Sequence, residues 1–208
     1  MKELIEIVET LKKSEIKNLV DSRIKKFKEM SKKSSDEIFK ELCFCIMTAN
    51  FNAEKSIRIQ NDIKSGFCYL SEPQLIEKLE KFGHRFPIAR AKYIVEARKH
   101  KNSLKESFDQ FETDGELREW LAKNVKGFGY KEASHFLRNI GYTNLAIIDF
   151  HIIDLLVKHK LIERPKTLTA KKYIEIENLL KEIAKKLDLN LAELDLYLWY
   201  METGKVLK

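Results

Sequence analysis

Residues that interrupt helices are scarce in this chain, which has seven glycines and three prolines among 208 residues. Leu, Ile, Lys and Glu dominate, and apolar residues recur at spacings of three and four over most of the sequence. Segments with the two-residue period of a β-strand are hard to find. We therefore predict an all-α protein whose helices are joined by short connections.

Cysteine is equally scarce. The three cysteines, Cys43, Cys45 and Cys68, form no Cys-x2-Cys pair and cannot pair off evenly, so we expect reduced thiols rather than a disulfide framework. Cys43 and Cys45 lie in a nearly all-apolar helical stretch, where a spacing of two residues points them apart. We read them as small core hydrophobes and expect no metal site.

Long hydrophobic runs are absent as well. The first residues, 1–7, mix acidic and basic side chains and lack the apolar core of a signal peptide. No later run approaches the length needed to span a bilayer. We expect a cytoplasmic protein that does not enter a membrane.

Basic residues exceed acidic ones, with 39 Lys and Arg against 32 Asp and Glu, a net charge of +7 and a pI of about 9.1. That excess favours a polyanionic partner such as nucleic acid. A charged fraction of 34%, with Lys and Glu interspersed, is equally typical of solvated helix faces or of a thermophile's surface. Charge by itself leaves both interpretations open.

Helical periodicity accounts for most of the chain. Ser34 and Glu37 have the spacing of a capping box, and the helix that follows is nearly all apolar, as expected for a central core helix. Gly141 is placed to end a later helix. The expected helices span about residues 3–13, 15–30, 38–49, 53–65, 72–82, 88–101, 116–124, 131–140, 150–157, 169–187 and 191–203.

Gly127 and Gly129 interrupt this helical pattern two residues apart, which predicts a tight hairpin with room for a ligand close to the backbone. A helix begins near Lys131, and its first N–H groups and partial positive charge suit a bound phosphate. Lys126 and Lys131 flank the hairpin.

Lys131 and Asp149 are candidates for a chemical role. The field at a helix N-terminus disfavours the ammonium of Lys131, and the neutral amine is a nucleophile towards a sugar carbon or a carbonyl. The spacing by itself favours a simpler role for Lys131, in which its ammonium contacts a phosphate. The helix that begins near Lys131 carries the chain about 15 Å away from the lysine. The eight residues that follow it, 141–148, can span about 26 Å. Asp149 can therefore return beside Lys131.

Asp149 closes an apolar run and opens a helix, so an N-cap role explains it fully. The alternative is a carboxylate at the edge of the core that stabilises a positive charge or orients a nucleophile. His151 can donate to a phosphate from the same helix start, or be a partly buried capping residue. Neither residue decides the function singly.

Several motifs together resemble one enzyme family. The hairpin Gly127-Phe-Gly-Tyr-Lys131 is followed eighteen residues after the lysine by Asp149. Supporting segments are residues 41–51, 83–86, 130–139, 193–199 and 203–208. From about residue 14 onward, the chain is similar to the compact 8-oxoguanine DNA glycosylase/AP lyase family first recognised in archaea. That family lies within the helix-hairpin-helix, Gly/Pro-rich loop and Asp superfamily of DNA glycosylases.

The resemblance implies a mechanism. Lys131 would attack C1′ of a flipped nucleotide, expel the oxidised base and form a Schiff base, after which β-elimination nicks the strand. Asp149 would support the cationic sugar or activate the lysine. Phe86 and Trp199 would be the faces between which the base stacks. Lys208 would separate the oxidised base from guanine.

The resemblance also implies a fold and a partner, double-stranded DNA containing 8-oxoguanine. Two helical subdomains would flank a DNA-binding cleft, one from about 36–145 and the other from about 1–35 and 146–208. We expect a monomer that associates with the nucleoid. Asn50 would fill the gap left by the flipped base, while the hairpin amides and His151 would hold phosphates. The implied DNA-binding residues are Asn50, Arg85, Lys126, Gly127, Gly129 and His151.

The chain departs from the superfamily pattern at several points. It lacks the cysteine quartet that binds an iron–sulfur cluster, so we expect no such cofactor. A monovalent cation on the hairpin carbonyls is the one ion that the resemblance allows. The hairpin reads Val125-Lys-Gly127 in place of Leu-Pro-Gly, and Phe150 stands where an arginine is expected. The competing hypotheses are a non-catalytic helix-hairpin-helix module that grips duplex DNA and a helical protein-interaction scaffold.

Overall fold

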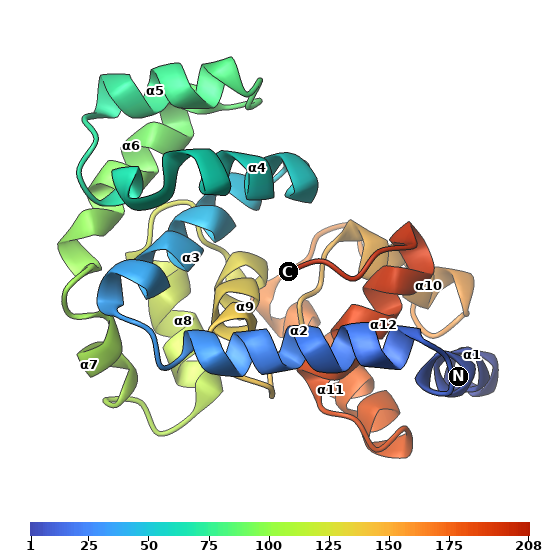
Figure 1. Cartoon of the computed structure of the whole chain (residues 1–208). Coiled ribbons are helices and arrows are strands. Elements are labelled where there is room, and N and C mark those ends of the chain that lie inside the picture. Colours follow the sequence, from blue (N-terminus) through green and yellow to red (C-terminus); the bar gives the residue numbers. More distant parts are fainter.

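The computed structural model describes all 208 residues and contains twelve α-helices, two 3-10 helices and no strands (Figure 1). The all-α prediction is confirmed. The helices are α1 (Lys2–Lys12), α2 (Ile16–Met30), α3 (Ser35–Thr48), α4 (Ala53–Ile63), η1 (Lys64–Cys68), α5 (Glu72–Lys81), α6 (Pro87–Ala97), η2 (Arg98–His100), α7 (Leu104–Phe108), α8 (Asp114–Asn124), α9 (Tyr130–Asn139), α10 (Phe150–Lys158), α11 (Ala170–Lys186) and α12 (Leu191–Thr203). None of them combines the length and the apolar character needed to cross a membrane.

The observed helices differ from the expected ones at three short segments. α7 is an additional helix of five residues, too short to reveal itself by periodicity. The helices expected over 53–65 and 88–101 end at Ile63 and Ala97 and continue as the 3-10 turns η1 and η2. At Lys64 φ is +50°, which takes the backbone out of the α-helical region.

The start of α3 confirms half of the predicted capping box. The Ser34 hydroxyl accepts a hydrogen bond from the Glu37 N–H at 3.4 Å. The Glu37 carboxylate pairs with Lys40 instead of returning to the cap. The serine therefore caps the helix without the reciprocal bond.

Helix α3 is the centre of a first hydrophobic core. All of its residues from Glu41 to Thr48 are buried, and α4, α6, α7, α9 and η1 pack around it. Cys43 and Cys45 are fully buried free thiols whose pKa is raised by burial, as expected for core hydrophobes. This first core contains buried residues from Ile38 to Leu145.

A second core forms between α1, α2, α10, α11 and α12. Its buried residues lie between Leu4 and Phe27 and between Ala146 and Leu198. Helix α2 contacts α9 on the side of the first core and α12 on the side of the second. In Figure 1, the C-terminus lies between these two groups of helices.

A buried ion pair joins the two cores. Arg118 of α8 pairs with Glu177 of α11, and each side chain is 3% exposed. Glu177 also accepts a hydrogen bond from the Ala146 N–H at 2.9 Å. The Tyr173 hydroxyl accepts from the Ile148 N–H at 3.1 Å and donates to the Ala146 carbonyl at 2.7 Å. The segment that leads into α10 is thus held in place by side chains of α11.

Candidate active site

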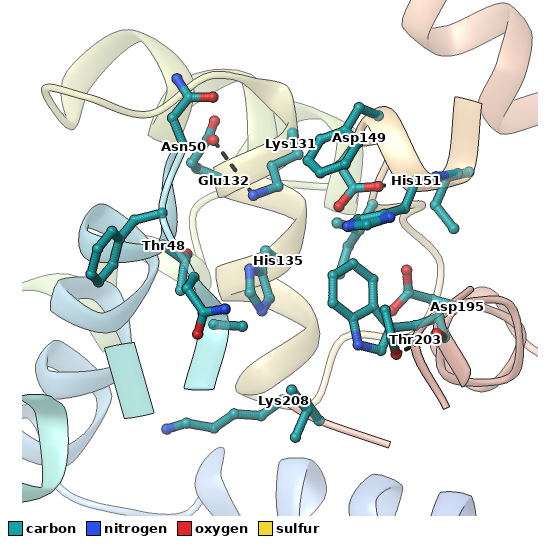
Figure 2. Close-up of a pocket in the computed structure, with 18 of the residues that line it drawn as sticks. Thr48, Asn50, Lys131, Glu132, His135, Asp149, His151, Asp195, Thr203 and Lys208 are labelled. Atoms are coloured by element: carbon teal, nitrogen blue, oxygen red, sulfur yellow. Dashed lines mark hydrogen bonds and ion pairs between the residues drawn. The ribbon is translucent and has the colours of Figure 1, made fainter. Parts of the chain in front are cut away.

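A cavity of about 840 Å³ lies between the two groups of helices. Its walls come from the turn between α3 and α4, from α9, from the start of α10, from α12 and from the last residues of the chain (Figure 2). The predicted site residues that line it are Asn50, Arg85, Lys131, Asp149, His151, Trp199 and Lys208. The predicted site residues that do not line it are Phe86, Lys126, Gly127 and Gly129.

Lys131 and Asp149 lie at the same edge of this cavity (Figure 2). The Lys131 side chain is 23% exposed, and its Nζ lies 3.7 Å from Glu132 Oε1. Asp149 caps α10, because its Oδ1 accepts a hydrogen bond from the Ile152 N–H at 3.1 Å. Its Oδ2 has no hydrogen-bond partner in the protein. One carboxylate oxygen therefore serves the fold, and the other is free to act in the cavity.

The glycine hairpin requires glycine at one of its two positions. Gly127 has φ of +89°, and a Cβ there would come within 2.6 Å of the Tyr93 ring. Gly129 is extended, with φ of −112°, and its N–H donates to Glu132 Oε2 at 3.1 Å. One of the amides expected to hold phosphate is therefore paired with a carboxylate of the protein itself.

We expect Gly127→Ala to lower the free energy of unfolding by about 1–3 kcal/mol, because alanine is disfavoured at positive φ and its Cβ meets the Tyr93 ring. Gly129→Ala is the matched control, since its φ suits any residue and the new Cβ would meet only Glu132 Oε2, at 3.4 Å. Urea unfolding of both variants measures the difference. A loss for Gly129→Ala as large as that for Gly127→Ala would contradict this account.

Lys126 lies on the outer side of the hairpin. Its Nζ is 3.7 Å from Glu96 Oε2 and 5.8 Å from the centroid of the Tyr93 ring. The side chain is 49% exposed. It can therefore reach an external phosphate without entering the cavity.

Phe86 does not line the cavity, so the predicted pair of stacking rings is not formed in this structure. Phe86 immediately precedes α6 and is 36% exposed. The guanidinium groups of Arg85 and Arg90 lie 5.1 and 5.5 Å from the centroid of its ring. In this structure the Phe86 ring therefore packs against these two arginines and not against the cavity. Trp199 remains the predicted stacking ring that lines it.

Asn50 reaches the cavity from the turn after α3. Its φ is +56°, a left-handed conformation that asparagine tolerates better than most residues. Two buried side chains hold the turn: His84 Nε2 donates to the Met47 carbonyl at 3.0 Å, and Arg90 Nη2 donates to the Ala49 carbonyl at 2.6 Å. The exposed Asn50 is thus presented by a well-anchored backbone.

Trp199, His151 and Phe150 form an aromatic wall. The His151 ring lies 4.9 Å from the Trp199 ring, edge to face, and 4.0 Å from the Phe150 ring. Trp199 is half-buried, and its Nε1 has no hydrogen-bond partner. Phe150, which replaces an expected arginine, is 64% exposed. This part of the rim therefore offers an apolar surface where a charge was expected.

Lys208 is docked on the helices of the first core. Its ammonium donates to Glu41 Oε1 at 2.7 Å and to Gln60 Oε1, and lies 4.4 Å from the centroid of the Phe44 ring. Gln60 Nε2 donates in turn to Glu41 Oε1 at 3.0 Å. Because the ammonium is bound to these partners, the main-chain atoms of Lys208 are the polar atoms that can contact a ligand in the cavity.

The cavity is also lined by residues whose place in the site was not predicted from the sequence, among them His135, Arg138 and Asp195. Arg138 and Asp195 form a buried ion pair, in which burial raises the pKa of Asp195 to about 6 and Arg138 opposes the shift. His135 and Arg138 follow Lys131 at helical spacings of four and seven, so periodicity could have found them. Asp195 carries no such signal, because its partner is 57 residues away.

The chain resembles known proteins over its whole length. Residues 20–189 match the family model of 8-oxoguanine DNA glycosylase. The chain is 55% identical over 206 residues to the 8-oxoguanine DNA glycosylase/AP lyase of Methanocaldococcus jannaschii, with 99% of each chain covered. The crystal structure of the M. jannaschii 8-oxoguanine glycosylase/lyase in complex with a 15mer DNA containing 8-oxoguanine is 55% identical and has a TM-score of 0.96, covering 99% of this chain and 100% of that one. The crystal structure of the 8-oxoguanine DNA glycosylase of Thermotoga maritima has a TM-score of 0.94 at 42% identity, covering 100% and 99%.

Proposed function

Because the chain belongs to the family of 8-oxoguanine DNA glycosylases, we infer that it is a base-excision repair enzyme that removes 8-oxoguanine from DNA and then cleaves the strand at the abasic site. Its partner is DNA that contains the lesion. One observation supports the residue roles proposed below: a single cavity is lined by Lys131 and Asp149 and also by Lys208 (Figure 2).

The target base leaves the duplex stack before it can react. A cavity of about 840 Å³ has room for a nucleobase, and we assign one stacking face to Trp199. Asn50, exposed on its turn, fills the space that the flipped base leaves. Unstacking costs a few kcal/mol, which contacts inside the cavity offset.

We assign the nucleophile to Lys131. Its neutral amine attacks C1′ of the flipped nucleotide; the C1′–Nζ bond forms as the C1′–N9 bond breaks and the base departs with the bonding electrons. Opening of the sugar ring gives an imine. Loss of a C2′ proton and cleavage of the C3′–O bond then complete β-elimination. The free Oδ2 of Asp149 stabilises the positive charge that develops on the sugar.

We assign base discrimination to the main chain of Lys208. Guanine N7 is a hydrogen-bond acceptor, whereas 8-oxoguanine carries a proton on N7 and donates there. A main-chain oxygen accepts from an N7–H but meets the lone pair of guanine N7 unfavourably. The ammonium of Lys208, held by Glu41 and Gln60, anchors this oxygen.

Removing Lys208 should narrow the preference for 8-oxoguanine over guanine by about tenfold to a hundredfold, the worth of one or two well-placed hydrogen bonds. The matched control is Lys205→Ala, which removes a lysine from the same tail, where it pairs with Glu54 at the exposed rim of the cavity. Single-turnover excision from duplexes with either base gives the ratio. An unchanged ratio without Lys208 would remove this residue from base recognition.

We assign the remaining DNA contacts to the rim. Lys126 and the hairpin amides hold the backbone on one side, and Arg85 and His151 contact it near the cavity. Two subdomains would flank the DNA-binding cleft. One contains the helices of about 36–145, and the other contains those of about 1–35 and 146–208. We propose that one copy of the chain suffices, because it supplies every group named here.

Borohydride trapping tests the proposed chemistry. Reduction of the imine should link the protein covalently to a duplex with 8-oxoguanine and leave a matched guanine duplex almost unlinked. Protein that binds the duplex in a salt-dependent manner but yields neither a trapped complex nor strand cleavage would be a non-catalytic binding module.

A further inference from the structure

His135 lies in the middle of the cavity wall and has no role in the steps above. It follows Lys131 by one helical turn on α9, and Figure 2 shows it between Lys131 and Lys208. Its side chain lines the cavity although the residue is only 7% exposed. The Phe44 ring packs against it in a T-shaped arrangement, with the centroids 5.7 Å apart.

Neither ring nitrogen of His135 has a hydrogen-bond partner. The polar groups around it are paired: Arg138 with Asp195, and Glu41 with Gln60 and the Lys208 ammonium. Buried polar atoms without partners are rare in folded proteins and call for an explanation. Of the residues that line the cavity, only Trp199 also has a buried side-chain atom without a partner, its Nε1, whereas His135 leaves both a donor and an acceptor unused.

The surroundings of the ring favour the neutral imidazole. Burial, followed by the nearby cations Arg138 and Lys131, holds the pKa of His135 well below its usual value, and the Lys208 ammonium adds to this effect. The main chain of Lys208 acts in the opposite direction, as expected of an oxygen that faces the ring N–H. His135 and Lys208 line the same cavity, and no hydrogen bond joins the ring to Lys208 in this structure.

We propose that His135 is a positioning residue for base discrimination: its ring N–H donates to the main-chain oxygen of Lys208 when the base is bound. This inference rests on the role proposed above for Lys208. A main-chain oxygen has lone pairs for two donors, so it can accept from the imidazole and from N7–H at the same time. The ammonium of Lys208 anchors the residue from one side, and His135 orients its oxygen from the other.

Substitutions at His135 separate this role from packing. His135→Phe keeps a flat ring but has no donor, and we expect it to lower the preference for 8-oxoguanine over guanine by about tenfold or more. His135→Asn and His135→Gln each place an amide N–H near one of the two ring nitrogens. At least one of them should restore part of the preference that His135→Phe loses.

Cleavage of DNA with a preformed abasic site is the internal control. That reaction needs Lys131 but has no base to recognise, so His135→Phe should cleave such DNA at close to the wild-type rate. An equal loss on abasic DNA and on 8-oxoguanine DNA would place His135 in support of Lys131 and overturn the proposal. Wild-type protein that fails to excise 8-oxoguanine would instead overturn the proposed function.

A double-mutant cycle tests whether His135 acts through Lys208. If it does, His135→Phe should have little further effect on the base preference of protein that lacks Lys208. Additive losses would mean that the imidazole contacts the base independently, and an unchanged preference in His135→Phe would remove it from discrimination. Either result overturns the proposal.

Discussion

Lys131→Gln should abolish borohydride trapping and slow excision of 8-oxoguanine by roughly three orders of magnitude or more, because the amine that forms the bond to C1′ is gone. Glutamine keeps the length and polarity of the side chain, so binding of the duplex should persist. Gel mobility measures binding, and the covalent adduct measures chemistry. Trapping that survives the substitution would show that another amine is the nucleophile.

The chain offers its own control for this experiment in Lys126, five residues earlier on the outside of the hairpin. Lys126→Gln removes the same charge from the same surface, but the side chain does not line the cavity. We expect it to trap normally at saturating DNA. If Lys126 contacts a phosphate, its removal makes the negative slope of log binding constant against log salt concentration shallower by about 1.

Glu177→Ala should reduce the free energy of unfolding by about 3–5 kcal/mol, since it leaves the Arg118 guanidinium buried without its partner. For a chain of this size, that loss corresponds to a fall in melting temperature of roughly 6–20 °C. The substitution also removes the acceptor for the Ala146 N–H, in the segment that leads to Asp149. The variant should therefore excise 8-oxoguanine more slowly even at temperatures at which it is fully folded.

Glu175→Ala provides the comparison on the same helix. Glu175 pairs with Lys172 at 3.1 Å, but those side chains are 50% and 39% exposed. An exposed pair of this kind contributes about 1 kcal/mol or less. Urea unfolding of both variants gives the difference, and a Glu177→Ala loss no larger than that of Glu175→Ala would show that the buried pair does not join the cores.

Periodicity and turn chemistry predicted the elements that depend on neighbouring residues. The buried helix α3, the helix start near Lys131 and the glycine turn all follow from local spacing. For Asp149 the sequence left an N-cap and a carboxylate that supports the chemistry as alternatives; the structure shows the N-cap and leaves the second oxygen of the same carboxylate for the cavity that Asp149 lines. Local sequence could not show that both apply.

Features that depend on distant partners were beyond local reasoning. The resemblance paired Phe86 with Trp199, 113 residues later, and the sequence does not show that only Trp199 of the two lines the cavity in this structure. The sequence does not show that Lys208 meets Glu41, 167 residues earlier. It also does not show that the ring nitrogens of His135, one turn after Lys131, have no hydrogen-bond partner. Such contacts arise only after the helices have packed.

The path of the last five residues has a mechanical consequence. They leave α12, which belongs to the second core, and end against α3 and α4 of the first, where Lys208 is fastened. Lys131 and His135 lie on α9 of the same first core, so a motion that spreads the two groups of helices leaves Lys208 beside them and pulls on its link to α12. The same motion carries Asp149 and Trp199, which belong to the second group, away from Lys131. A spread molecule searching along undamaged DNA would therefore hold its nucleophile away from the supporting carboxylate, and the chemistry would require the molecule to be closed.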